Sequence, residues 1–101
     1  MIAELKVMTF NVRGLRDKKK RRSIFRHLHV KYPDSIVIMQ ETHSSIEVEN
    51  TWANEWGEGG IILAHGPTPY QGGVGLCYPQ KFKGQFEIIF AVMMVELFAP
   101  S

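Results

Sequence analysis

The apolar residues in the first half of the chain fall into two short segments that have the pattern of β-strands. Residues 4–10 alternate Leu5 and Val7 with polar neighbours and end in Phe10, and this alternation predicts a strand. Residues 36–39 form a continuous apolar run, Ile-Val-Ile-Met, which is typical of a strand buried on both faces. The sequence therefore predicts two strands, and the second is covered on both sides.

The segment between these strands has the spacing of a helix. Ile24 and Leu28 recur on one helix face, so residues 18–31 are predicted to form an amphipathic helix. Asp17 is the expected N-cap, and Pro33 stops the helix. A strand–helix–strand order of this kind favours a parallel strand pair joined by a right-handed crossover.

The parallel arrangement brings two polar residues to one edge of the sheet. Asn11 follows the first strand and opens a loop over residues 11–15, and Glu41 follows the second strand. The C-terminal ends of parallel strands lie at the same edge, where ligand sites of such sheets gather. Two simpler roles stay open: Asn11 as a turn residue that tolerates left-handed backbone, and Glu41 as a solvated carboxylate.

The sequence of the middle of the chain is compatible with a second helix and does not contain a dinucleotide-binding loop. Trp52 and Trp56 are four residues apart within residues 44–56 and could share one face of a helix, as packing residues more often than as platforms for nucleic-acid bases. The glycine-rich residues 72–75 lead into an apolar segment rather than a helix, so they do not fit a dinucleotide-binding loop.

Three further apolar segments in the second half are predicted to be strands. Residues 61–64 and 73–78 flank a turn that contains glycine and proline, which predicts an antiparallel hairpin. Residues 86–98 are strongly apolar and are expected to form a final strand. Within it, residues 88–95 are the segment most prone to aggregation if they are left uncovered.

Composition and length narrow the class of protein. The chain has 101 residues, enough for one domain, and its 45% hydrophobic and 22% charged residues indicate a folded protein rather than a disordered one. The single cysteine, Cys77, excludes a disulfide framework and favours a reducing, intracellular location, with the nucleus as one option. No secretory pattern opens the chain, and residues 88–95 are too few to cross a bilayer, which takes about 20 residues. We expect no membrane partner, and the sequence does not indicate an oligomeric state.

Positive charge is concentrated in the first third of the chain, although the formal net charge is only +2. Such a cluster could hold the phosphate backbone of nucleic acid, or it could be a solvated helix face. Cations in the first turns of a helix are disfavoured by its dipole, by about 0.3–1 kcal/mol, and this placement hints at a use. The candidate nucleic-acid-binding residues are Arg13, Lys18, Lys19, Lys20, Arg21 and Arg22.

Two motifs resemble those of a known enzyme family. Residues 9–15, Thr-Phe-Asn-Val-Arg-Gly-Leu, and residues 39–43, Met-Gln-Glu-Thr-His, are separated by a segment that contains Pro33-Asp34. Together they resemble the opening of the endonuclease/exonuclease/phosphatase family, and most closely the endonuclease domains of non-LTR retrotransposons. The resemblance extends over residues 5–79 and is weaker over residues 80–96.

The resemblance implies a fold, a cofactor and roles for two residues. The family fold is a four-layer α/β/β/α sandwich, and residues 1–101 would be the N-terminal part of one such deoxyribonuclease-like domain, of class α/β (α+β). By resemblance, Asn11 would lie at the phosphate and metal site, and Glu41 would bind a divalent ion, Mg²⁺ or Mn²⁺. DNA is the implied substrate. A partial sandwich would also leave apolar sheet surface uncovered.

The chain departs from the family pattern towards its C-terminal end. Phe98 stands where many members have a tyrosine that contacts the scissile phosphate, and Glu96 stands where they have an asparagine. The later Asp-x-Asn pair, the second aspartate and the catalytic histidine of the family have no counterpart in this chain.

Three functions are compatible with these observations. The first is a magnesium-dependent endonuclease that cleaves DNA, with activity expected to be absent from this part alone. The second is a non-catalytic remnant that at most binds nucleic acid through its basic helix. The third is a phosphatase or deadenylase of the same family.

Overall fold

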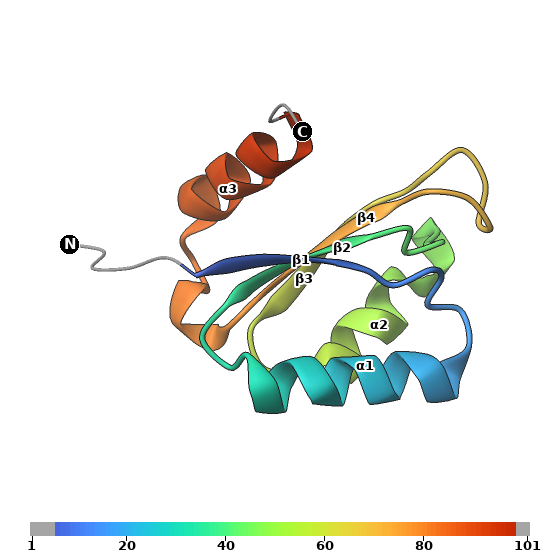
Figure 1. Cartoon of the computed structure of the whole chain (residues 1–101), viewed down its shortest axis with the longest axis horizontal. Helices are drawn as coiled ribbons and strands as arrows, with labels where there is room; N and C mark the ends of the chain where they lie inside the picture. Colours follow the sequence, from blue (N-terminus) through green and yellow to red (C-terminus); the bar gives the residue numbers. More distant parts are fainter. Residues whose placement is uncertain (1–5, 99–101) are drawn as a thin grey trace.

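A mixed sheet of four strands lies at the centre of the molecule (Figure 1). The structure is a computed structural model that describes residues 6–98. The strand order is β1-β2-β4-β3. The strands are β1 (Val7–Asn11), β2 (Ile36–Gln40), β3 (Gly60–Ala64) and β4 (Val74–Tyr78). The helices are α1 (Lys18–Lys31), α2 (Glu49–Trp56) and α3 (Phe86–Phe98), with short 3₁₀ turns η1 (Ile46–Val48) and η2 (Gln80–Phe82).

The first strand–helix–strand unit forms as the sequence predicts. β1 and β2 pair in parallel, in a register that runs from Val7 opposite Ile36 to Asn11 opposite Gln40. Asp17 caps α1, because its Oδ2 accepts a hydrogen bond of 2.9 Å from the backbone nitrogen of Lys20. The structure thus confirms both predicted strands within the described residues, the helix over 18–31, and the parallel pairing.

The predicted hairpin is also confirmed. β3 and β4 pair antiparallel, from Gly60 opposite Tyr78 to Ala64 opposite Val74. β4 lies between β3 and β2 and is antiparallel to β2 as well. The two strands with parallel pairing and the two of the hairpin therefore form one continuous sheet, with β1 and β3 at its edges.

Side chains alternate between the two faces of the sheet, and helices cover both. On one face Val37 and Met39 of β2 join a core with the helices α1 and α2, and on the other face Ile36 and Ile38 pack with residues of α3. Figure 1 shows α1 and α2 on one side of the sheet and α3 on the opposite side. β2 is the most completely covered strand, with Ile36, Val37, Ile38 and Met39 all buried, which agrees with its continuous apolar pattern.

The segment over residues 86–98 is a helix, and the prediction of a final strand is wrong. Ile89, Val92 and Met93 have helical spacing and pack onto the second face of the sheet. The segment is apolar on nearly every side, so its period is hidden, and its 13 residues are longer than most strands. Continuous hydrophobicity could not distinguish a helix from a strand, and length was the better guide.

This helix also changes the expectation of an uncovered sheet. α3 packs on the face of the sheet opposite α1 and α2, so that face is partly covered by a helix. Some apolar surface is exposed on α3 itself, where Val95 is 64% exposed. The described residues form a mixed α/β layer structure, which agrees with the predicted α+β class. Within residues 6–98, no helix has both the length and the apolar character needed to pass through a membrane.

Candidate functional site

Asn11 and Glu41 meet at the edge of the sheet where β1 and β2 end. Asn11 is the last residue of β1, and Glu41 follows β2 directly, so the parallel register places them side by side. The side-chain Nδ2 of Asn11 donates a hydrogen bond of 2.6 Å to Oε2 of Glu41, and both residues are exposed. Oδ1 of Asn11 accepts a bond of 3.0 Å from the backbone nitrogen of Arg13. The predicted juxtaposition of amide and carboxylate is therefore present.

Backbone hydrogen bonds fix the segments around this pair. The nitrogen of Gly14 donates to the carbonyl of Glu41 at 2.6 Å, and the nitrogen of Leu15 donates to the carbonyl of Thr42 at 3.0 Å. On the other side, the nitrogen of Thr42 donates to the carbonyl of Gly73 at 3.2 Å. Three loop segments, residues 12–15, 41–43 and 72–73, thus continue the sheet beyond its strands, and we call them the site floor.

Three non-glycine residues of the site floor have left-handed backbone. The φ angles are 52° at Arg13, 55° at Glu41 and 54° at His43. Each costs about 1–2 kcal/mol for a residue with a Cβ, and such residues cluster at functional sites when the surroundings over-determine them. Gly14 is needed beside them, because a Cβ there would come within 2.6 Å of Nδ1 of His43.

A hydrogen-bonded chain of side chains, which sequence reasoning missed, holds the residues that follow Glu41. Oγ1 of Thr42 lies 3.0 Å from Oγ of Ser44, which lies 2.8 Å from Nδ1 of His65. Nε2 of His65 lies 2.5 Å from Oε2 of Glu49. Thr42 and Ser44 are buried. This chain ties the site floor to the start of α2 and the end of β3.

The order of groups resembles a nucleophilic triad only superficially. Ser44 is 1% exposed, so a substrate could not reach its hydroxyl. These hydrogen bonds are better explained as a structural brace, in which His65 links the buried hydroxyl of Ser44 to the exposed carboxylate of Glu49. The two contacts of His65 span 21 and 16 residues of sequence, and no local sequence pattern indicates them.

The basic residues of the first third divide into two groups. Lys18, Lys19 and Arg22 are exposed at the start of α1, and Arg13 is exposed on the site floor. Nζ of Lys20 donates a bond of 2.9 Å to the carbonyl of Arg13, which brings a cation next to the floor.

Arg21 points inward and does not belong with the exposed cations. It is 6% exposed, and its Nε donates a bond of 2.7 Å to Oε1 of Glu55 on α2. Its guanidinium also lies 5.3 Å from the ring of Trp52. We therefore remove Arg21 from the set of residues that could contact phosphate.

The remaining aromatic and sulfur groups of interest are structural. Trp52 and Trp56 are buried on one face of α2, as predicted, and Nε2 of His29 lies 2.5 Å from the carbonyl of Trp56. Cys77 is buried in β4, and desolvation raises the pKa of its thiol far above the ordinary value, so it is not a reactive thiol.

The donors at the sheet edge suit a hard cation only in part. Glu41 offers an exposed carboxylate, and Mg²⁺ is commonly held by one or two carboxylates and several waters. Asn11 already uses both polar atoms within the protein, which fits an orienting role better than direct ligation. Among residues 6–98 no group of three or more His, Cys, Asp or Glu side chains could hold a metal ion. A cation here would therefore keep most of its water shell.

The predicted phosphate contact at the other end of the chain lies outside what the structure describes. The side chains of Glu96 and Phe98 are not described, nor are residues 99–101.

No protein-family model matches the chain, and no curated protein matches it.

Proposed function

We propose that this chain handles a phosphodiester of nucleic acid, DNA in the first instance, at the sheet edge where Asn11 meets Glu41. The proposal includes a deoxyribonuclease-like fold, of which the described residues would form one part, and the magnesium-dependent endonuclease chemistry that the resemblance implies. The observation that carries it is the 2.6 Å bond between the two side chains, which come from strand ends 30 residues apart in sequence.

The geometry supports a site for a cation and a phosphate in three ways. Glu41 is exposed, and its carboxylate is oriented by Asn11 rather than neutralised by a basic partner within the described residues. The backbone carbonyl of Glu41 accepts a bond from the nitrogen of Gly14, and the next residue, Thr42, donates its backbone nitrogen to the carbonyl of Gly73. Arg13 and Lys20 lie beside it and would attract a polyanion. A divalent cation bound by Glu41 would neutralise charge that develops on the phosphate.

The chain's own residues would position the phosphate more than activate the water. Asn11 fixes the carboxylate, and Lys20 places its charge over the carbonyl of Arg13. Among residues 6–98 we identify no group placed as a general base, and such a base typically contributes about 10²–10⁴-fold. We therefore expect slow turnover at best.

Nicking of supercoiled plasmid in Mg²⁺ tests the proposal. Glu41→Gln keeps the shape of the side chain and should reduce the rate by more than about 100-fold, since even partners of metal ligands are worth 10–100-fold. Glu58→Gln, at an exposed carboxylate between α2 and β3, is the matched control and should nick like the parent. Equal nicking by the parent and Glu41→Gln would remove Glu41 from the mechanism.

A second function, binding without cleavage, is favoured by the start of α1. Lys18 and Arg22 line an open hollow of about 310 Å³ together with Glu55, and Lys19 is exposed next to them. In this case the protein would bind nucleic acid with strong dependence on salt and would not nick it in Mg²⁺. Binding that persists in Glu41→Gln without any nicking by the parent would favour this second function.

A further inference from the structure

Tyr70 is an exposed ring at the tip of the loop between β3 and β4. It is 71% exposed, so packing within the chain does not account for its position. Its backbone is held nonetheless: the nitrogen of Tyr70 donates to Oγ1 of Thr68 at 3.2 Å, and the nitrogen of Gln71 donates to the carbonyl of Thr68 at 3.3 Å. Pro69 restricts the turn further. The ring is therefore presented by a defined turn.

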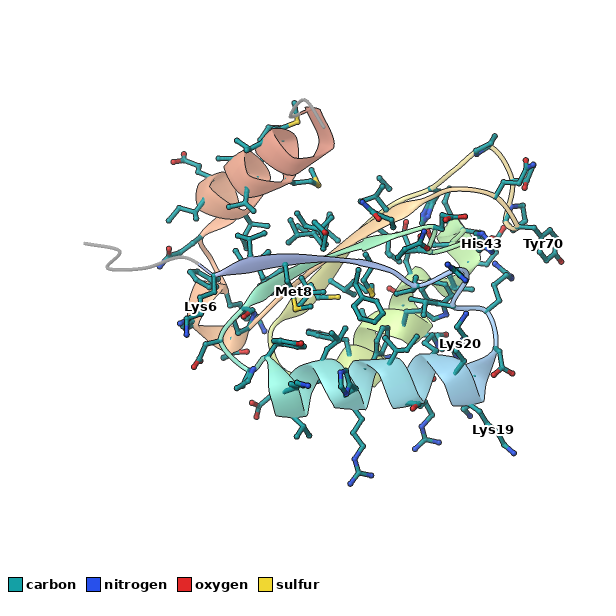
Figure 2. All side chains as sticks on the ribbon, viewed as in Figure 1. Lys6, Met8, Lys19, Lys20, His43 and Tyr70 are labelled. Carbon is teal, nitrogen blue, oxygen red and sulfur yellow. The ribbon has the colours of Figure 1, made fainter. Side chains whose placement is uncertain are left out.

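Arg16 joins this ring to the candidate site. Its guanidinium carbon lies 5.6 Å from the centroid of the Tyr70 ring, within the range of a cation–π contact. Its Nη1 donates to the carbonyl of His43 at 3.3 Å and to Oγ of Ser45 at 3.4 Å. Figure 2 shows His43 and Tyr70 at the same end of the molecule as Lys20. Arg16 thus connects the ring to His43 of the site floor, which is two residues beyond Glu41 in sequence.

We propose that Tyr70 and Arg16 form a subsite that stacks one unpaired nucleobase beside the phosphate handled at Glu41. This inference rests on the proposed function and names its substrate class: nucleic acid with an unpaired nucleotide, such as a single strand, a junction or an extruded base. An aromatic ring can stack on any nucleobase. The guanidinium of Arg16 is always positively charged, so it can also bind a neighbouring phosphate.

Duplex DNA alone fits this subsite poorly. Bases inside a duplex stack on one another, so a ring at a loop tip receives a base only after it has left the stack. Exposed cations on Arg13, Lys18 and Lys19 would bind either form through its phosphates. The subsite adds a preference for unpaired bases to that general attraction.

Binding to two single-stranded oligonucleotides of equal length tests the subsite. One is a thymidine 12-mer, and the other is a 12-mer of abasic residues with the same phosphates. Fluorescence anisotropy on the full chain in EDTA keeps the measurement independent of metal and of cleavage. We expect the thymidine oligonucleotide to bind at least about fivefold more tightly, because stacking on an aromatic residue contributes that much or more per base.

Variants assign the preference to the ring. Tyr70→Ala should abolish the difference between the two oligonucleotides and leave abasic binding unchanged, whereas Tyr70→Phe should retain the difference. Val30→Ala, at a residue 74% exposed near the other end of α1, is the control and should behave like the parent. Circular dichroism confirms that each variant is folded.

Several results would overturn the subsite. They are equal affinity of the parent for both oligonucleotides, no binding of either, an equal loss for both in Tyr70→Ala, or a loss in Tyr70→Phe as large as in Tyr70→Ala. The proposed function is tested separately, by the plasmid nicking assay. If nicking does not depend on Glu41, the proposed function fails, but the measured preference for thymidine over abasic oligonucleotides is unaffected.

Discussion

The guanidinium of Arg21 and the carboxylate of Glu55 form a two-point contact between α1 and α2. Nε of Arg21 lies 2.7 Å from Oε1, and Nη2 lies 3.0 Å from Oε2. Nη1 of Arg21 donates a further bond of 3.0 Å to the carbonyl of Leu15. Paired bonds of this kind fix geometry as well as charge. The contact therefore fastens α2 to the loop that carries one part of the site floor.

Breaking this contact from one side should destabilise the protein. Glu55→Gln leaves Arg21 as a buried cation without a charged partner, and we expect a loss of about 2–4 kcal/mol in the free energy of unfolding. Arg22→Gln removes an exposed cation from the same helix and should change it by less than about 0.5 kcal/mol. Urea denaturation measures both. A loss in Glu55→Gln no larger than in Arg22→Gln would contradict the role given to the pair.

The same pair makes stability depend on pH in the acid range. The hydrogen bond from Arg21 lowers the pKa of Glu55 below its ordinary value of 4.5, and Coulombic attraction by Arg21 adds to this, while burial opposes it. Because the pKa in the folded state lies below that in the unfolded state, the contribution is complete well above pH 4.5 and is lost as the pH falls through the folded-state value. The difference in unfolding free energy between the parent and Glu55→Gln should therefore be largest near neutral pH and shrink in acid. A constant difference across that range would count against this assignment.

Removing the amide that orients Glu41 should impair function more than folding. Asn11→Ala deletes an exposed hydrogen bond, and we expect a change in stability of about 1 kcal/mol or less. If Glu41 binds a metal ion as we propose, plasmid nicking should fall by about 10–100-fold, the loss that is typical when the partner of a metal ligand is removed. Gln40→Ala, at the exposed residue opposite Asn11 in the register, is the control. Loss of nicking by both variants to the same extent would show that Asn11 has no special role.

Neutralising the start of α1 should lower the salt dependence of DNA binding. The double variant Lys18→Gln/Lys19→Gln removes two exposed cations. The plot of log K against log salt has a negative slope, and its magnitude should decrease by up to about 2, at roughly 0.9 per phosphate contact. Arg26→Gln/Lys31→Gln removes the same charge further along the helix. If the two double variants have the same slope, net charge rather than the start of α1 governs binding.

The outer side of α3 should promote self-association. Val95 is 64% exposed, and Val95→Lys places a charge on this side without disturbing the core. Light scattering at increasing protein concentration should show less association, with the unfolding free energy unchanged within about 0.5 kcal/mol. Val30→Lys adds the same charge at an exposed residue of α1, and an equal improvement there would point to net charge instead.

The sequence predicted the parts of the fold that local chemistry determines. Asp17 caps α1, and the continuous run of β2 is buried on both faces, since each depends on residues close by in the chain. The meeting of Asn11 and Glu41 followed from one topological inference, that β1 and β2 run in parallel. The sequence predicted a strand where α3 forms, because a segment with so few polar residues shows no helical alternation of apolar and polar positions.

The direction of Arg21 and the brace through His65 depend on distant partners. Arg21 binds a carboxylate 34 residues away, and the basic run around it looks uniform in sequence. A signal was nevertheless available: Arg21 precedes Phe25 by four residues and Leu28 by seven, so it lies on the buried face of α1. No equivalent signal exists for the pairing of Ser44 with His65, which arises only when the hairpin docks beside the site floor.

The left-handed backbone at Arg13, Glu41 and His43 limits how far this protein could be engineered for heat tolerance. Glycine at any of the three would relieve torsional cost in the native chain, although part of the gain would be offset by the greater freedom of glycine when unfolded. Each such exchange would also delete a side chain at the rim of the candidate site. A variant made by this route would unfold at a higher temperature but would lack side chains that border the candidate site.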